Sequence, residues 1–159
     1  MIIAVDYDGT VVPKLPEGYC EVDTGAERVL RKIVEAGHLL VLWTCRNNSI
    51  DNPFNFVRGV LREESSLEEA VRWFDEHKIP LYGINDIPNQ SSIIGKSRKL
   101  LCDILIDDTS IGIPLVFGEV NYVSYETGEI YYNYYTHCVD WRAVESILIQ
   151  RKIIRKTKK

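Results

Sequence analysis

Two carboxylates, Asp6 and Asp8, follow the apolar residues 2–5 at the start of the chain. Gly9 and Thr10 come directly after them. Open α/β sheets place their chemistry at strand ends that border a crevice. Carboxylates this close repel one another unless a cation or protons intervene, and hard oxygen ligands suit Mg2+. The motif therefore predicts a divalent metal site at the end of the first strand.

Polar residues also close other apolar runs. A second acid pair, Asp107 and Asp108, follows the apolar residues just before it, and a third apolar run, residues 39–43, ends in Thr44. A basic segment, residues 96–99, precedes the second acid pair. An isolated Asp-x-Asp is usually a solvated turn. Here acids or a threonine follow three separate apolar runs. This favours one shared site, because the carboxyl ends of parallel strands meet at one edge of the sheet.

This order of motifs resembles the haloacid dehalogenase-like (HAD) superfamily of phosphohydrolases, and the resemblance covers roughly residues 1 to 115. It implies a Rossmann-like fold and a phospho-aspartyl mechanism. By resemblance, Asp6 is the nucleophile and Asp8 the general acid and base. Mg2+ would be held by Asp6, the carbonyl of Asp8 and Asp108, with Asp107 bonded to a lysine or to metal waters. The roles of Asp107 and Asp108 could also be exchanged.

The resemblance assigns two more catalytic groups. Thr44 would bind a phosphate oxygen through its hydroxyl, although a β-branched residue at a strand end needs no such role. Lys99 would offset the charges of the phosphate and of Asp6. Lys96 and Arg98 are its competitors in the same segment, and the whole run could equally be a solvated helix face.

Three residues are candidates for substrate binding. Gly9 would let the chain turn and approach the phosphate closely. Thr10 would orient Asp8 or serve as a simple turn hydroxyl. Arg46 follows the second motif at a spacing where a guanidinium can form paired hydrogen bonds with phosphate, although a surface salt bridge is the alternative.

The remaining pattern predicts a single Rossmann-like α/β domain, with a mainly parallel sheet flanked by helices and a C-terminal β-hairpin and helix. Thr24 and Glu27 form a candidate capping box for the first helix, and Ser65 or Ser66 caps the second. A short helix should carry residues 96–101. The first strand should be central, with the second and fourth strands on either side of it.

The last third of the chain has a different pattern. Tyrosine-rich segments on either side of residues 126–129 predict a β-hairpin, and Asp140 should cap a final helix. We therefore expect a catalytic domain at 1–150, with the hairpin at about 120–135 and the last helix at about 140–152, and a basic, flexible tail at 151–159.

The composition is typical of a globular protein, with 159 residues, 45% hydrophobic and 26% charged. No apolar run approaches the roughly 20 residues of a membrane span. The four cysteines form no CxxC pair. Reduced thiols, no secretory signal and a cytoplasmic location without a membrane partner are the expectations.

Charge is unevenly distributed along the chain. Six of the 19 basic residues lie in residues 151–159. Residues 1–150 therefore contain 13 basic residues and all 23 acidic residues. Such an acidic body should not bind nucleic acid over its surface, but the tail could attract it. A solvated terminus is the alternative interpretation of the tail.

The spacing of the motifs leaves no room for a folded cap domain. Asp8 and Thr44 are separated by one helix and a loop, and residues 47–64 could form only a small flap. The chain therefore looks capless, and the resemblance implies a Mg2+-dependent phosphomonoester hydrolase acting on a phosphorylated small molecule or nucleotide. A nucleotidase or nucleic-acid end phosphatase, and a catalytically silent HAD-like binding protein, are the alternatives. Some capless members close their site by forming an oligomer, so both a monomer and an oligomer remain alternatives for this chain.

Overall fold

The computed structural model describes residues 1–16, 18–51, 55–57, 60–61, 64–97 and 99–156. The helices are α1 (Ala26–Glu35), α2 (Ser66–Glu76), α3 (Gln90–Ile94) and α4 (Trp141–Gln150). The strands are β1 (Ile2–Val5), β2 (Gly18–Tyr19), β3 (Leu39–Leu42), β4 (Phe56–Val57), β5 (Val60–Leu61), β6 (Gly83–Ile84), β7 (Ile104–Ile106), β8 (Leu115–Ser124) and β9 (Ile130–Val139).

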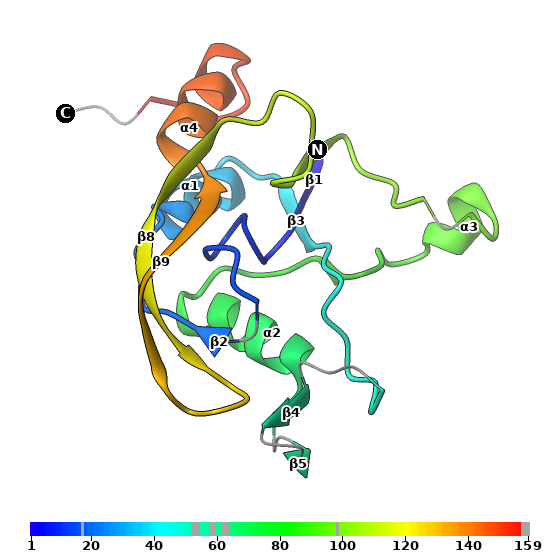
Figure 1. Cartoon of the computed structure of the whole chain (residues 1–159). Helices are drawn as coiled ribbons and strands as arrows, with labels where there is room; N and C mark the ends of the chain where they lie inside the picture. The colour runs from blue at the N-terminus through cyan, green and yellow to red at the C-terminus, as the bar shows by residue number, and fades with distance from the viewer. Residues whose placement is uncertain (17, 52–54, 58–59, 62–63, 98, 157–159) are drawn as a thin grey trace.

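A four-stranded sheet with the order β6-β3-β1-β7 forms the centre of the molecule (Figure 1). All of its pairings are parallel, and Val5 is level with Leu42 on one side and Ile106 on the other. This is the predicted order, with the first strand between the second and the fourth. The Rossmann-like α/β fold class is confirmed, and the carboxyl ends of β1, β3 and β7 lie along the same edge.

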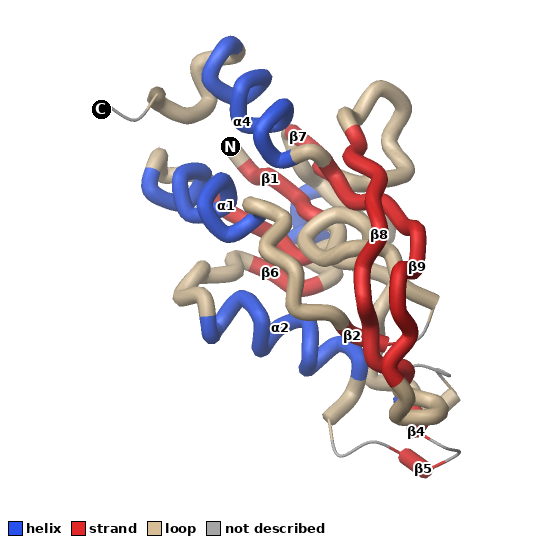
Figure 2. The backbone as a smooth tube through the Cα atoms, turned by 60° about the vertical axis from the view of Figure 1, so that its left-hand side comes forward, coloured by secondary structure: helices blue, strands red, loops and turns tan. Residues whose placement is uncertain are grey.

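The two faces of this sheet are covered differently. Ile3 and Val5 point to the face that packs against α1, α2 and α4, and Ala4 points to the other face, where it packs with Ile87 and Leu100. This alternation follows from the two-residue period of a strand. Figure 2 shows α1, α2 and α4 gathered on one side of the sheet.

The predicted hairpin is confirmed and is longer than expected. Strands β8 and β9 pair in antiparallel fashion, and β2 joins β8 to complete a second sheet. Figures 1 and 2 show this hairpin as a long, curved ribbon beside the central sheet. The final helix is also confirmed, because the side chain of Asp140 accepts hydrogen bonds from Arg142 N and Ala143 N at the start of α4.

Helix caps were predicted with mixed success. The capping box of α2 is formed by Ser65 and Glu68, which confirms one of the two candidate caps. The capping box predicted for α1 is wrong, because the N-cap is Gly25 and has no side-chain cap. The hydroxyl of Thr24 instead donates to the carbonyl of Val11 at 2.7 Å, which fixes the loop before α1.

The short helix also lies earlier than predicted. Helix α3 ends before Gly95, whose φ of 65° and ψ of −145° break the helical path. Residues 96, 97 and 99–101 therefore lie outside the helix. Figure 1 shows α3 extended to one side of the molecule.

The described part of the basic segment is anchored to the body. Ile154 is 3% exposed, and the carbonyl of Ile153 lies 2.7 Å from Nε2 of His38. Residues 157–159 of the predicted tail, and parts of the predicted flap at 47–64, lie outside the described residues. Among the described helices, none is both long and apolar enough to cross a membrane.

Candidate functional site

Asp6, Asp107 and Asp108 form an acidic cluster at the carboxyl edge of the central sheet. Each offers one carboxylate oxygen, and these oxygens lie within 4.8 Å of one another. The parallel pairing of β1 and β7 causes this, since Val5 and Ile106 are level and Asp6 N donates to the carbonyl of Ile106 at 3.0 Å. The next residues on both strands are then acids.

The environment of Asp6 disfavours a negative charge. Burial raises the pKa of Asp6 to about 7, and the charges of Asp107, Asp8 and Asp108 contribute to the rise, whereas a hydrogen bond with the backbone of Tyr7 opposes it. A cation at this position would relieve the repulsion between the carboxylates.

Asp108 is the most constrained member of the acidic cluster. Its Oδ2 accepts a hydrogen bond from Lys14 Nζ at 3.2 Å and lies 2.9 Å from His137 Nε2. Its Oδ1 is buried and has no hydrogen-bond partner within the described part of the chain. A buried carboxylate oxygen without a partner is costly, so it calls for a ligand or a water. The acidic donor set and this oxygen fit a hard divalent cation such as Mg2+.

Gly9 and Thr10 hold the loop after β1 against Asp108. Gly9 has a φ of 82°, and a Cβ added there would lie 2.5 Å from Asp108 Oδ2. The Thr10 hydroxyl donates to Asp6 Oδ2 at 3.4 Å and accepts from Asp108 N at 3.0 Å. Because Thr10 is fully buried, its hydroxyl connects two members of the acidic cluster and does not face a substrate.

Asp107 and Asp108 both reach the acidic cluster. Asp107 Oδ1 accepts hydrogen bonds from the N–H and the hydroxyl of Thr109 at 2.7 and 2.6 Å, which leaves its Oδ2 for a further ligand. The geometry therefore brings both acids within reach of one ion. A contact through the carbonyl of Asp8 stays a prediction.

Asp8 is held by Arg46. The guanidinium donates to Asp8 Oδ2 and Oδ1 at 2.9 and 2.8 Å, and to Glu69 Oε2 at 3.1 Å. It also lies 4.6 Å from the ring centre of Tyr7. Burial opposes the charge of Arg46, but Asp8 and Glu69 hold its pKa above the ordinary value. The predicted phosphate ligand Arg46 is therefore bound to acidic side chains in this structure.

Glu69, which accepts a hydrogen bond from Arg46, has a further partner. The hydroxyl of Tyr125, from the turn after β8, donates to Glu69. Neither Glu69 nor Tyr125 was identified from the sequence, where both look like ordinary helix and hairpin residues. The two residues connect the hairpin to α2 above Asp8.

Thr44 lies at the end of β3, beside the acidic cluster. Its N–H donates to Asn85 Oδ1 at 2.8 Å, and its hydroxyl accepts from Arg46 N at 3.2 Å. The hydroxyl is half-buried and shapes the turn that carries Arg46. Whether it also binds phosphate stays a prediction.

The lysine beside the aspartates is Lys14. Lys99 is exposed, and within the described residues no hydrogen bond or ion pair joins its side chain to the acidic cluster. The pKa of Lys14 is raised: burial opposes its charge, but the hydrogen bond to Asp108 and the charges of Asp108, Asp6 and Asp8 outweigh that effect. Lys14 could have been identified from the sequence only by its closeness to the first motif, and no pattern in the sequence pointed to His137.

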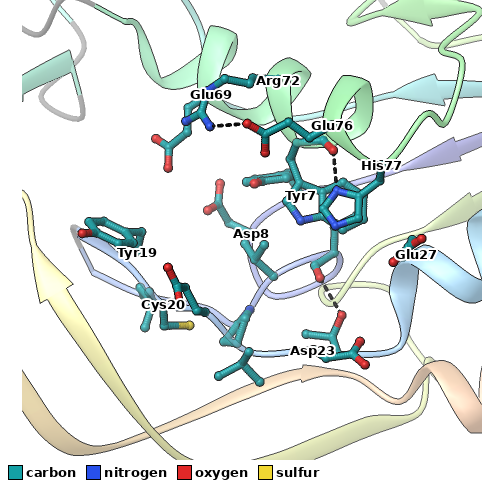
Figure 3. Close-up of a pocket in the computed structure, with 18 of the residues that line it drawn as sticks. Tyr7, Asp8, Tyr19, Cys20, Asp23, Glu27, Glu69, Arg72, Glu76 and His77 are labelled. Carbon is teal, nitrogen blue, oxygen red and sulfur yellow. Dashed lines mark hydrogen bonds and ion pairs between the residues drawn. The ribbon is translucent and has the colours of Figure 1, made fainter.

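A cavity of about 570 Å³ lies beside the acidic cluster. Asp8 lines it, whereas Asp6, Asp107 and Asp108 do not. Figure 3 shows Asp8 between side chains of α2, such as Glu69 and Glu76, and residues of the loop that leads to α1. Asp8 is thus the residue that connects the strand-end motif to the cavity.

The chain matches no protein-family model, and no curated protein matches it significantly. A solved structure described as the conserved protein coded by a locus from Bacteroides thetaiotaomicron is similar, with 29% sequence identity and a TM-score of 0.53. The match covers 70% of this chain and 78% of that chain. The similarity agrees with the Rossmann-like α/β architecture, and the description names no activity.

Proposed function

We propose that the protein is a Mg2+-dependent phosphomonoester hydrolase that works through an aspartyl-phosphate intermediate. The observation that carries this proposal is the acidic cluster of Asp6, Asp107 and Asp108 at one sheet edge, with Asp8 two residues beyond Asp6. A carboxylate nucleophile, a separate acid and a hard cation site are the groups that this chemistry needs.

The two acids of the first motif have complementary roles. A carboxylate oxygen of Asp6 attacks phosphorus and forms a mixed anhydride, and the bond from phosphorus to the alcohol oxygen breaks. Asp8 gives its proton to that oxygen as the alcohol leaves. Asp8 then accepts a proton from water, whose oxygen attacks the phosphorus, and the products are inorganic phosphate and free Asp6.

Basic groups and a bound metal would offset the negative charge of the phosphate and the aspartates. Mg2+ bound by the three aspartates would offset the negative charges of the phosphate and the nucleophile. Lys14 adds a positive charge beside Asp108, and it is the preferred candidate for the role that Lys99 was expected to fill. Arg46 holds and orients the ionised Asp8 carboxylate through two hydrogen bonds, so Asp8 has to take up a proton from solvent and give up one of these hydrogen bonds before it acts as the acid.

The proposal is tested with Asp6→Asn and an aryl phosphate in the presence of Mg2+. Loss of the nucleophile should lower kcat by at least about 10³-fold. Asp75→Asn, at an exposed position of α2, is the control and should retain wild-type kcat. Mass spectrometry of wild-type enzyme quenched during turnover should find phosphate on the peptide with Asp6. Full activity of Asp6→Asn would exclude the mechanism.

A further inference from the structure

The cavity beside Asp8 is the place where the alcohol part of a substrate would have to lie. A general acid must reach the oxygen of the leaving alcohol, and Asp8 faces the cavity while the acidic cluster does not. The loop after β1, the loop before α1 and helix α2 form its walls (Figure 3). Its volume of about 570 Å³ is within the range of small-molecule sites.

The lining of the cavity is strongly acidic. Its charged members are the carboxylates Asp8, Glu21, Asp23, Glu27, Glu69 and Glu76 and the guanidinium groups Arg46 and Arg72. Arg46 is already bound by Asp8 and Glu69. Arg72 is bound by Glu76 and, outside the lining, by Glu64. Both guanidinium groups are therefore neutralised by the protein and leave little charge for an anionic ligand.

Two carboxylates of the lining have few partners. Within the described residues, Glu21 takes part in no hydrogen bond or ion pair, and Asp23 accepts one hydrogen bond, from Gly25 N at 2.8 Å. Their free oxygens are acceptors that a ligand with hydroxyl or ammonium groups can satisfy. A ligand with a second carboxylate or phosphate would instead meet like charge, which disfavours binding.

Aromatic side chains complete the walls. Tyr7, Tyr19 and Trp73 line the same cavity, and Tyr19 is 46% exposed. Tyr7 is 4% exposed and its ring is covered by Arg46, and Trp73 is stacked on His77, so the exposed ring of Tyr19 is the main apolar face on which a carbon skeleton can pack while its hydroxyl or amino groups meet the carboxylates. The combination of ring faces and open acceptors suits a small polyol or amino sugar.

We propose that this cavity binds the alcohol part of the phosphate ester and selects alcohols with several hydroxyl or ammonium donors and no second anionic group. This inference rests on the proposed function, because it uses Asp8 as the acid that protonates the leaving oxygen. It disfavours nucleoside polyphosphates and nucleic-acid ends as substrates, since both bring further phosphates close to the acidic lining.

Three esters of similar size test the selection. Glucosamine 6-phosphate, glucose 6-phosphate and 6-phosphogluconate carry a cationic, a neutral and an anionic alcohol part. With Mg2+, kcat/KM for the first two should exceed that for the third by at least about tenfold, since like charges at a binding surface cost more than 1.4 kcal/mol. The ratio of the first two separates an ammonium from a hydroxyl preference. Equal or better hydrolysis of 6-phosphogluconate would overturn the proposal.

A double variant tests whether the cavity causes the discrimination against an anionic alcohol part. Glu21→Gln with Asp23→Asn removes two negative charges from the lining and should reduce the discrimination against 6-phosphogluconate at least about threefold. Glu35→Gln with Glu119→Gln makes the same change of net charge at exposed positions outside the lining and should leave the ratio unchanged. The same ratio in both double variants would assign the selection to another part of the molecule.

Binding without turnover separates this proposal from the hydrolase itself. If no ester is hydrolysed, the proposed function fails, and the cavity is tested with glucosamine, glucose and gluconate by amide chemical shifts of the labelled protein. Glucosamine or glucose should shift the amides of residues 18–24, and gluconate should not. Shifts confined to other regions, no shifts, or equal shifts with gluconate would exclude the cavity as the selective site.

Discussion

One carboxylate, that of Asp108, combines two different environments. Its Oδ2 lies near two basic side chains, Lys14 and His137, while its Oδ1 is buried without a hydrogen bond from the described residues. Lys14 is 45% exposed at its side chain and approaches from solvent, whereas the Asp108 side chain is only 4% exposed. A positively charged group that reaches a buried acid from outside can also contact a phosphate placed there.

Exchange of each candidate lysine for methionine decides between them. Lys14→Met removes a charge-assisted hydrogen bond worth about 1.5–3 kcal/mol and should lower kcat/KM for an aryl phosphate by about 10–100-fold. Lys99→Met, at an exposed position, should change it less than about twofold. Thermal unfolding of both variants checks that the fold is retained. A larger loss in Lys99→Met than in Lys14→Met would return the role to Lys99.

The contrast between Asp6 and Lys14 shows what the sequence could predict at this scale. Asp6 is placed by its own strand, so its motif carries the information. Lys14 is positioned by a segment that is distant in the sequence. The N–H of Lys14 donates to the carbonyl of His137 at 3.0 Å, and the hydroxyl of Thr136 donates to the carbonyl of Lys14. Contacts between residues more than a hundred positions apart leave no local pattern, and the lysine nearest the second acid pair was the natural but untested choice.

At the scale of elements, the hairpin is built onto the strand-end motif. Val139 N donates to the carbonyl of Gly9 at 3.0 Å, and Trp141 Nε1 donates to the carbonyl of Thr10 at 2.8 Å. The end of β9 and the start of α4 therefore fix the loop that carries Asp6 and Asp8. The hairpin itself was predictable from its tyrosine-rich strands, but its role in holding this loop was not.

The same distinction explains which elements the sequence predicted. The sheet order follows from a compact βαβ connection and from strands that end in polar residues, both of which are local patterns. The capping box predicted for α1 failed because the N-cap is Gly25, one residue after Thr24, so the hydroxyl of Thr24 accepts from Ala26 N at 3.3 Å and donates to the carbonyl of Val11. The prediction of the short helix failed because it was placed at residues 96–101, after Gly95, whereas Gly95 ends the helix.

Helices α1 and α4 are joined by an ion-pair network whose contribution can be measured. Glu145 of α4 accepts hydrogen bonds from Arg28 and Lys32 of α1 at 2.5 and 2.6 Å. Burial acts to raise the pKa of Glu145, but the hydrogen bonds from Lys32 and Arg28 lower it below its ordinary value of 4.5. Glu145→Gln should lower the free energy of unfolding at pH 7 by about 1 kcal/mol.

The pH dependence of this difference follows from the direction of the shift. A carboxyl whose pKa is lowered by folding stabilises the native state above its ordinary pKa, and the stabilisation is lost as the pH falls through the folded pKa. Urea unfolding should therefore separate Glu145→Gln from wild type at pH 7, and the difference should shrink as the pH falls below the ordinary pKa of 4.5 and through the lower pKa of folded Glu145. Glu119→Gln, at an exposed position of β8, is the control. A difference that does not change with pH would show a packing effect.

For the whole molecule, the carboxyl edge of the central sheet concentrates negative charge. The acidic cluster and the acidic cavity lie side by side and share the loop of Asp6 and Asp8, in a chain with a formal net charge of −4. Clustered acids favour the binding of cations and raise their local concentration. A cation bound there also links β1 to β7, so its binding should be coupled to the stability of the fold.

Mg2+ should therefore raise the thermal stability of the protein. A ligand that binds only the folded state at 100 times its Kd adds about 2.7 kcal/mol, which corresponds to a rise in Tm of roughly 5–10 °C for a chain of this size. Asp108→Asn removes one charge from the acidic cluster and should abolish most of that rise, whereas Asp75→Asn, outside the cluster, should keep it. Scanning calorimetry with and without Mg2+ measures the difference.

An unchanged Tm in wild type, or an equal rise in Asp108→Asn, would show that the acidic cluster does not bind Mg2+. Such a result would also remove the main support for a metal-dependent hydrolase, because the basic side chains Lys14 and Arg46 are already paired with Asp108 and Asp8.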